Sequence, residues 1–379
     1  MLFKEIIGQD LIKRDLCQMV ANDRLPHALL FLGNEGVGKL SLAIALAQYI
    51  LCENPSEEDA CGHCNTCQKV SKLIHPDMHF SFPVIGSKVT SDQYLPQWRE
   101  ALIEHPYFNI NDWLQIIGAE NKQGNINKDE CLNIVKKLSL KTFEGKKKVL
   151  IIWLPEYLGK EGNRLLKLIE EPPEGTVFIL VAERDDLILN TILSRCQIVT
   201  INNLKDEEIK TALVQKRGLN ETDAQELCYL ADGNYNEAVK LSQQKQNNYA
   251  TLFITWLRLC YGGNWTKIAN WVDEFSKLGR ENQKYFIGYA LHFVRELLVL
   301  KFSTEMKGRL SEAEKQSAVK MGQLLDLHQI DRIIELLDKS SYFIERNANP
   351  KVLFFSNSIR MNKIFKNQEV DSMISEIKI

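Results

Sequence analysis

The chain has 379 residues, of which 45% are hydrophobic and 25% are charged, and its formal net charge is −2. This length allows two or three domains with sizeable cores, and the composition is ordinary for a globular protein. The small net charge excludes a global electrostatic attraction to nucleic acid or membranes, so any contact with DNA would be local. Since no apolar run is long enough to span a membrane and the first residues lack a signal-peptide layout, we expect a cytoplasmic protein.

The N-terminal region alternates helix and strand patterns. Apolar spacing predicts a helix over residues 10–22, and a short apolar run predicts a buried strand over 28–32. A glycine-rich turn follows at 33–39, and a helix is predicted from Leu40 to Leu51. The order strand, glycine loop, helix is typical of the start of a doubly wound α/β domain with a parallel sheet.

The middle of the chain combines an irregular stretch with further strands. Residues 76–125 contain several prolines, glycines and aromatic residues, and we predict a long irregular insertion there. A helix is predicted over 162–170, where it stops before Pro172 and Pro173 because proline cannot continue a helix. Apolar composition predicts three further buried strands, over residues 149–154, 176–182 and 198–201.

The C-terminal half has helical periodicity throughout. Amphipathic helices are predicted over residues 206–216, 222–231 and 234–244, and a second helical block is predicted over 248–365. We therefore predict three domains: an α/β domain over 1–203, a small helical domain over 204–246 and a larger all-helical domain over 247–379.

Residues 33–40 match the phosphate-binding loop G-x-x-x-x-G-K-[ST] except at the last position. Gly33, Gly36 and Gly38 would allow backbone N–H groups to point at phosphate, and Lys39 would reach the terminal phosphates. The alternative is a tight glycine turn without a ligand. The preceding strand, the following helix and Lys39 favour a nucleotide site, at least in the ancestry of the chain.

Both metal-holding positions of such a site lack their usual ligands. Leu40 stands where a hydroxyl should reach Mg²⁺, and Ser41 is rotated about 100° away on the helix. The strand that should end in acidic residues runs instead into Trp153, Leu154 and Pro155. Because the charge on a γ-phosphate must be neutralised in the transition state, we do not expect hydrolysis by this chain.

Four of the nine cysteines lie close together, with the spacing C-x8-C-x2-C-x2-C. A C-x2-C turn places two sulfurs on one ion, and four thiolates complete a closed tetrahedral zinc site with a structural role. An iron–sulfur cluster and free thiols are the alternatives. The predicted zinc ligands are Cys52, Cys61, Cys64 and Cys67.

Several motifs occur in a fixed order along the first 245 or so residues. They are residues 25–31 (LPHALLF), the phosphate loop, the four cysteines, residues 163–173 (NRLLKLIEEPP) and residues 191–196 (TILSRC). This order resembles bacterial DNA polymerase III clamp-loader subunits. The resemblance implies an AAA+ P-loop domain, a helical lid domain and an all-α collar domain for oligomerisation. It also implies gamma/tau and delta subunits as partners in a ring, with the sliding clamp and primer-template DNA contacted through the complex.

The family contains ATP-hydrolysing gamma/tau subunits and delta-prime subunits that have lost hydrolysis. This chain departs from the ATPase pattern at several positions, and the departures favour the delta-prime type, with ATP binding in doubt although Lys39 is kept. They are Leu40, Trp153, Leu154, Ala182 and Glu183 at a γ-phosphate-sensing position, and Asn236 where a lid arginine is usual.

Arg195 matches the family's arginine finger, which acts on the nucleotide of a neighbouring subunit. A guanidinium at a subunit boundary can stabilise charge on a neighbour's γ-phosphate. The alternative is that Arg195 only pairs with a carboxylate of its own chain.

For the whole protein, the alternatives are an active gamma/tau-type ATPase and a zinc-bearing DNA-binding module. The net charge of −2 and the closed cysteine site disfavour the DNA-binding module.

Overall fold

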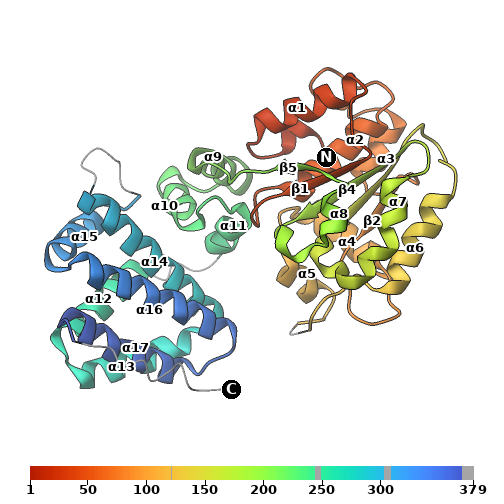
Figure 1. Ribbon diagram of the computed structural model, residues 1–379. Coiled ribbons are helices and arrows are strands. Elements are labelled where there is room, and N and C mark those ends of the chain that lie inside the picture. Colours follow the sequence, from red (N-terminus) through yellow and green to blue (C-terminus); the bar gives the residue numbers. More distant parts are fainter. Residues whose placement is uncertain (121, 244–248, 303–308, 369–379) are drawn as a thin grey trace. The chain divides into compact units, whose positions relative to one another are not determined.

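The computed structural model describes residues 1–120, 122–243, 249–302 and 309–368. The chain forms two compact units, Met1–Lys240 and Leu241–Ile379 (Figure 1). The first unit contains the α/β domain together with the predicted lid region as far as Lys240. The division into three domains stays a prediction, and its boundary at 246/247 lies outside the described residues.

The first unit is built on a parallel sheet of five strands in the order β2-β3-β4-β1-β5. The four strands expected from the sequence are present, as β1 (Ala28–Leu32), β3 (Lys148–Trp153), β4 (Thr176–Ala182) and β5 (Gln197–Thr200). The doubly wound parallel α/β class is therefore confirmed.

Both faces of the sheet are covered by helices (Figure 1), because side chains alternate between the faces along each strand. One face packs on α1 (Asp10–Ala21) and α2 (Lys39–Leu51), through residues such as Phe31, Ile151 and Ile179. The other face carries Leu30, Leu150 and Phe178. It is covered by α6 (Lys128–Ser139), η3 (Pro155–Leu165), α7 (Leu166–Glu170) and α8 (Asn190–Leu193).

The prediction of an irregular insertion over 76–125 is wrong. This segment supplies the edge strand β2 (Met78–Ser81), and it also forms η2 (Ser91–Tyr94), α4 (Leu95–Glu104) and α5 (Ile110–Ile116). A strand of four residues is too short to show a clear periodicity. The helices depend on tertiary packing, since Trp98 and Trp113 are fully buried against each other, with ring centroids 5.0 Å apart.

The lid helices are α9 (Asp206–Arg217), α10 (Glu221–Ala231) and α11 (Tyr235–Gln243). They agree closely with the three helices expected from the sequence. Their core includes two residues from outside the lid, Ile7 and Tyr107.

Within residues 249–302 and 309–368, the regular elements of the second unit are all helices, as expected. It consists of α12 (Tyr249–Gly262), α13 (Trp265–Phe275), η5 (Ser276–Leu278), α14 (Arg280–Phe302), α15 (Glu312–Leu324), α16 (Leu327–Glu345) and α17 (Pro350–Phe365). Its centre is aromatic: Phe354 packs against Phe275 and Phe286, with ring centroids 4.3 and 5.9 Å away. None of the helices in the described ranges has the length and apolarity that crossing a bilayer requires.

Candidate functional site

The predicted phosphate loop lies between β1 and α2. Its glycines adopt backbone conformations or close approaches that larger residues would not tolerate. Gly36 and Gly38 have φ values of 71° and 89°, in the left-handed region that favours glycine. A Cβ atom on Gly33 would lie 2.3 Å from the carbonyl oxygen of Ile201. Glycine is therefore favoured at Gly36 and Gly38, and no larger side chain fits at Gly33.

Lys39 does not extend into solvent. Its side chain is 5% exposed, its Nζ donates to the carbonyl oxygen of Asn34, and it lies 3.8 Å from Oε1 of Glu183. Burial lowers the pKa of Lys39, although Glu183, Glu156 and Glu35 act to raise it. Burial also raises the pKa of Glu183 to about 7, against the opposing effect of Lys39. Carboxylates of the chain itself thus surround the cation that would meet phosphate.

The two residues at the end of the loop, Leu40 and Ser41, face the protein interior. Leu40 is buried in the core, and the Oγ of Ser41 points to the carbonyl oxygen of Pro106, 3.4 Å away, so it does not replace the missing hydroxyl. Within the described part of the chain, the four cysteines are the group of His, Cys, Asp or Glu side chains close enough together to hold a metal ion.

Trp153 is the last residue of β3, and the sequence predicts that an ATPase would carry its magnesium-binding carboxylate there. Trp153 is buried, and its ring centroid lies 5.2 Å from that of Trp98 and 5.3 Å from that of Phe108. Both partners come from the 76–125 segment. An apolar aromatic cluster therefore fills the space beside the strand end.

The four predicted zinc ligands converge. Their sulfur atoms all lie within 4.8 Å of one another. Cys52 caps the C-terminus of α2, Cys64 is the N-cap of α3 (Asn65–Ser71), and Cys67 lies inside that helix. The sulfurs accept backbone N–H bonds, from Cys61 to Cys52 at 3.3 Å and from Cys64 to Cys61 at 3.4 Å. This donor set fits zinc, because N–H···S bonds stabilise thiolates and four sulfurs close a tetrahedron.

Arg195 lies just after α8, and its side chain is 30% exposed. Its Nη2 and Nε both contact Oε2 of Glu170, at 3.0 and 3.2 Å, and its Nη1 donates to the carbonyl oxygen of Thr191 at 2.9 Å. The intrachain pairing that the sequence left open is therefore present, with a carboxylate from the end of α7. The same bonds hold the guanidinium in one place at the surface.

Sequence reasoning missed what surrounds the loop. Glu35 was not singled out, although it accepts hydrogen bonds from Asn109 and Asn234 at 2.9 and 3.3 Å. Nothing in the pattern of residues 105–112 showed that they would lie between the loop and the lid. The sequence feature that could have indicated this packing is Trp153, since a large aromatic side chain at a strand end needs partners to pack against.

A parallel sheet that leads through a glycine loop into a helix, with helices packed over that loop, defines an α/β protein of the P-loop type. The particular family follows from sequence comparison. The model of the family described as "DNA polymerase III, delta subunit" matches residues 8–205, which is more than half of the chain. The chain belongs to this family of clamp-loader proteins.

Comparisons with individual proteins agree with this family assignment. The chain is 27% identical to DNA polymerase III subunit delta' of Bacillus subtilis, over 63% of this chain and 60% of that protein. It is 22% identical to subunit tau of the same organism, over 93% of this chain and 60% of that protein. The chain thus spans about 60% of the length of the curated relatives it matches. Among solved structures, a gamma subunit-related protein of Thermotoga maritima is 14% identical over 93% of this chain and 99% of that chain, with a TM-score of 0.40.

Proposed function

We propose that this chain is an ATPase-deficient subunit of the delta-prime type in a DNA polymerase III clamp loader. In this proposal it assembles in the cytoplasm with gamma/tau and delta subunits into a ring. The ring places a sliding clamp on primer-template DNA. Family membership and similarity to relatives named delta', gamma and tau support the proposal.

The observation that carries the ATPase deficiency is Trp153 in its aromatic cluster. P-loop hydrolysis needs Mg²⁺ held from both the loop and the strand end, and a water molecule that is positioned for attack. Here the loop offers Leu40 and the strand end offers a buried indole. Retention of Lys39 does not compensate, because its ammonium group is buried beside Glu183.

Arg195 is proposed to act on the nucleotide of a neighbouring subunit. Its partly exposed position after α8 supports this role. Glu170 would keep the guanidinium in place until a neighbour's γ-phosphate, which carries more charge, replaces the carboxylate.

A structural zinc ion on Cys52, Cys61, Cys64 and Cys67 completes the proposal. When bound, zinc would join the end of α2 to the start of α3 and stabilise the fold of the segment between them.

The alternative is an active gamma/tau-type ATPase. The alignment to a tau subunit over 93% of this chain and the retention of Lys39 favour it. Measuring ATP hydrolysis by the purified chain distinguishes the two proposals. The purified chain with Mg²⁺ and ATP should show no turnover above background, and steady hydrolysis that disappears in Lys39→Ala would establish the alternative.

The role of Arg195 is tested in a complex reconstituted with gamma/tau and delta subunits. Arg195→Ala should leave assembly and zinc content unchanged but lower DNA-stimulated ATP hydrolysis, and the loss should be partial because only one site adjoins this subunit. Arginine fingers contribute on the order of 10³-fold or more in simple switches. The control is Arg184→Ala, since Arg184 also pairs with an acidic residue, Asp186, at a more exposed position. Equal hydrolysis by both variants and the wild type would reduce Arg195 to a structural residue.

A further inference from the structure

Asp59 lies in the loop 53–60, between the first two predicted zinc ligands, and its carboxylate binds the beginning of the chain. Its Oδ1 accepts a hydrogen bond from the backbone N–H of Phe3 at 3.1 Å, and its Oδ2 accepts one from that of Lys4, also at 3.1 Å. These two N–H groups open the 3-10 turn η1 (Phe3–Glu5), where a helix has no backbone acceptors for them. Asp59 therefore holds a turn that lies 55 residues away from it in the sequence.

The loop 53–60 is itself attached to helices α1 and α2. The hydroxyl of Tyr49 in α2 donates to the carbonyl oxygen of Ser56 at 2.8 Å, and Sγ of Cys17 in α1 donates to that of Glu58 at 3.2 Å. Zinc bound by the cysteines on either side of the loop would close its two ends into a ring, and closing a loop removes alternative conformations. We therefore expect the path of the loop, and of the carboxylate that it carries, to depend on zinc.

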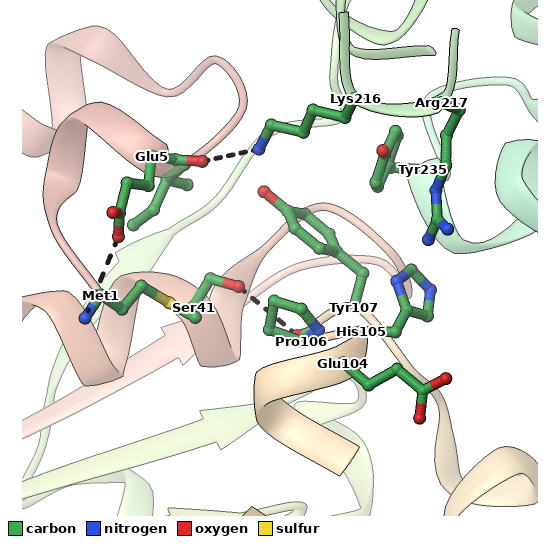
Figure 2. Close-up of a pocket in the computed structure, with 11 residues that line it drawn as sticks. Met1, Glu5, Ser41, Glu104, His105, Pro106, Tyr107, Lys216, Arg217 and Tyr235 are labelled. Atoms are coloured by element: carbon green, nitrogen blue, oxygen red, sulfur yellow. Dashed lines mark hydrogen bonds and ion pairs between the residues drawn. The ribbon is translucent and has the colours of Figure 1, made fainter. Parts of the chain in front are cut away.

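The segment of residues 1–7 also contributes to the wall of the cavity shown in Figure 2. The cavity has a volume of about 310 Å³, and three residues of the segment line it: Met1, Glu5 and Ile6. The carbonyl oxygen of Glu5 accepts a hydrogen bond from Nζ of Lys216, which also lines the cavity, at 2.8 Å (Figure 2). The backbone N–H of Ile7 donates to the hydroxyl of Tyr107 at 3.1 Å. Residues 1–7 thus extend from the cysteine module to this cavity.

We propose that zinc binding by the four-cysteine module controls the position of residues 1–7, with Asp59 as the positioning residue. With zinc bound, the loop 53–60 is closed, and its carboxylate holds the first N–H groups of η1. Without zinc, the segment separates from the module, and the cavity loses the lining that this segment contributes. The sheet does not depend on these contacts, since its strands pair with one another. This inference rests on the proposed zinc site and is independent of ATP hydrolysis and of Arg195.

Hydrogen exchange of the full-length chain, followed by mass spectrometry, tests this inference. Removing zinc with a chelator under reducing conditions should speed exchange over residues 1–9 by about 10-fold or more and leave β1 and β4 unchanged. Trypsin should then cut after Lys4, and added zinc should restore protection. Equal exchange and cleavage with and without zinc, in protein whose zinc content is confirmed by elemental analysis, would overturn the inference and leave the zinc site standing. Absence of zinc from protein purified without chelators would overturn both.

Asp59→Ala tests the connection itself while zinc stays in place. The variant should keep its zinc but show the fast exchange of residues 1–9 and the cleavage after Lys4. Cleavage is the sharper readout, because it requires the segment to leave the surface and not only to lose two hydrogen bonds. The control is Glu57→Ala, which removes an exposed carboxylate from the same loop and should behave like wild type.

The Asp59→Ala variant also decides the question if the zinc-free chain unfolds as a whole, which fast exchange in β1 and β4 would reveal. Zinc-loaded Asp59→Ala protein that resists trypsin at Lys4 as well as wild type does would contradict the inference.

Discussion

At the scale of single residues, Lys39 is the cation of the glycine loop, and its neighbours include acidic side chains. The loop still places it at the start of α2, but it faces Glu183 at the end of β4. Burial disfavours the charged form of both groups, which is why the pKa of Lys39 is lowered and that of Glu183 is raised to about 7. The pair is therefore a local source of pH dependence.

The sign of that dependence follows from Glu183. Its folded pKa of about 7 lies above the ordinary value of about 4.3 for glutamate. The folded state thus binds the proton more tightly, so the stability gained is full at low pH and is lost as pH rises through 7. We expect the free energy of unfolding to fall by on the order of 2 kcal/mol between pH 5 and pH 8 through this group.

Urea unfolding at several pH values measures this effect. Glu183→Gln should flatten the curve between pH 5 and pH 8, whereas Glu171→Gln, at an exposed position, should leave its slope unchanged. Parallel curves for wild type and Glu183→Gln would show that the carboxyl group does not titrate in this range.

At the scale of elements, the aromatic cluster ties β3 to α4 and α5. Trp153 contacts Trp98 and Phe108, and Phe82 stacks on Trp98 with ring centroids 4.1 Å apart. Large-to-small changes in such a core lose both the transfer free energy and the packing around the cavity that remains. Trp153→Ala should lower the free energy of unfolding by about 3–5 kcal/mol, measured by chemical denaturation. A loss below about 1 kcal/mol would mean that the cluster is not a stabilising core.

The cysteine module makes a second element-scale prediction. We expect one zinc ion per chain, measured by elemental analysis of protein purified without chelators. Cys64→Ser should lower zinc content, speed hydrogen exchange over residues 52–67 and lower stability, because the binding energy of a structural metal is folding energy. The control is Cys260→Ser, since Cys260 is buried in the second unit and takes no part in the module. Zinc-free wild-type protein with a fully protected module would contradict the prediction.

The limits of sequence prediction are also clearest at this scale. Strands β1, β3 and β4 were predictable because each is a continuous apolar run, and the convergence of the cysteines followed from their spacing. Strand β2 was not, since its four residues alternate too briefly to give a pattern. The contacts of Lys39 and Asn236 were not predictable either, because their partners, Glu183 and Asp112, are brought together by the fold across long sequence separations.

At the scale of the whole molecule, the chain has two units with separate hydrophobic centres. The first is organised around the sheet, and the second around aromatic residues such as Trp256, Phe286 and Phe354. Unfolding of such proteins often departs from a single two-state transition. We expect two transitions in a denaturant titration followed by hydrogen exchange.

Paired substitutions assign the transitions. Trp153→Ala should lower the midpoint of the first unit alone, and Phe354→Ala, which empties a fully buried site in α17, should lower that of the second. If both substitutions shift every peptide together, the two units unfold as one cooperative body.

The aromatic cluster around Trp153 also affects whether substitutions could give the chain ATPase activity. Under the proposed loss of hydrolysis, a return to activity would need a carboxylate in place of this indole, yet that change alone would open a cavity beside Trp98 and Phe108 and bury a charge among apolar rings. Each effect costs several kcal/mol, against a typical total stability of about 5–15 kcal/mol. Replacing Leu40 by a hydroxyl-bearing residue first would not produce hydrolysis, because the carboxylate would still be missing. Because the proposal requires both changes together and the carboxylate alone threatens folding, it predicts that neither single substitution produces hydrolysis.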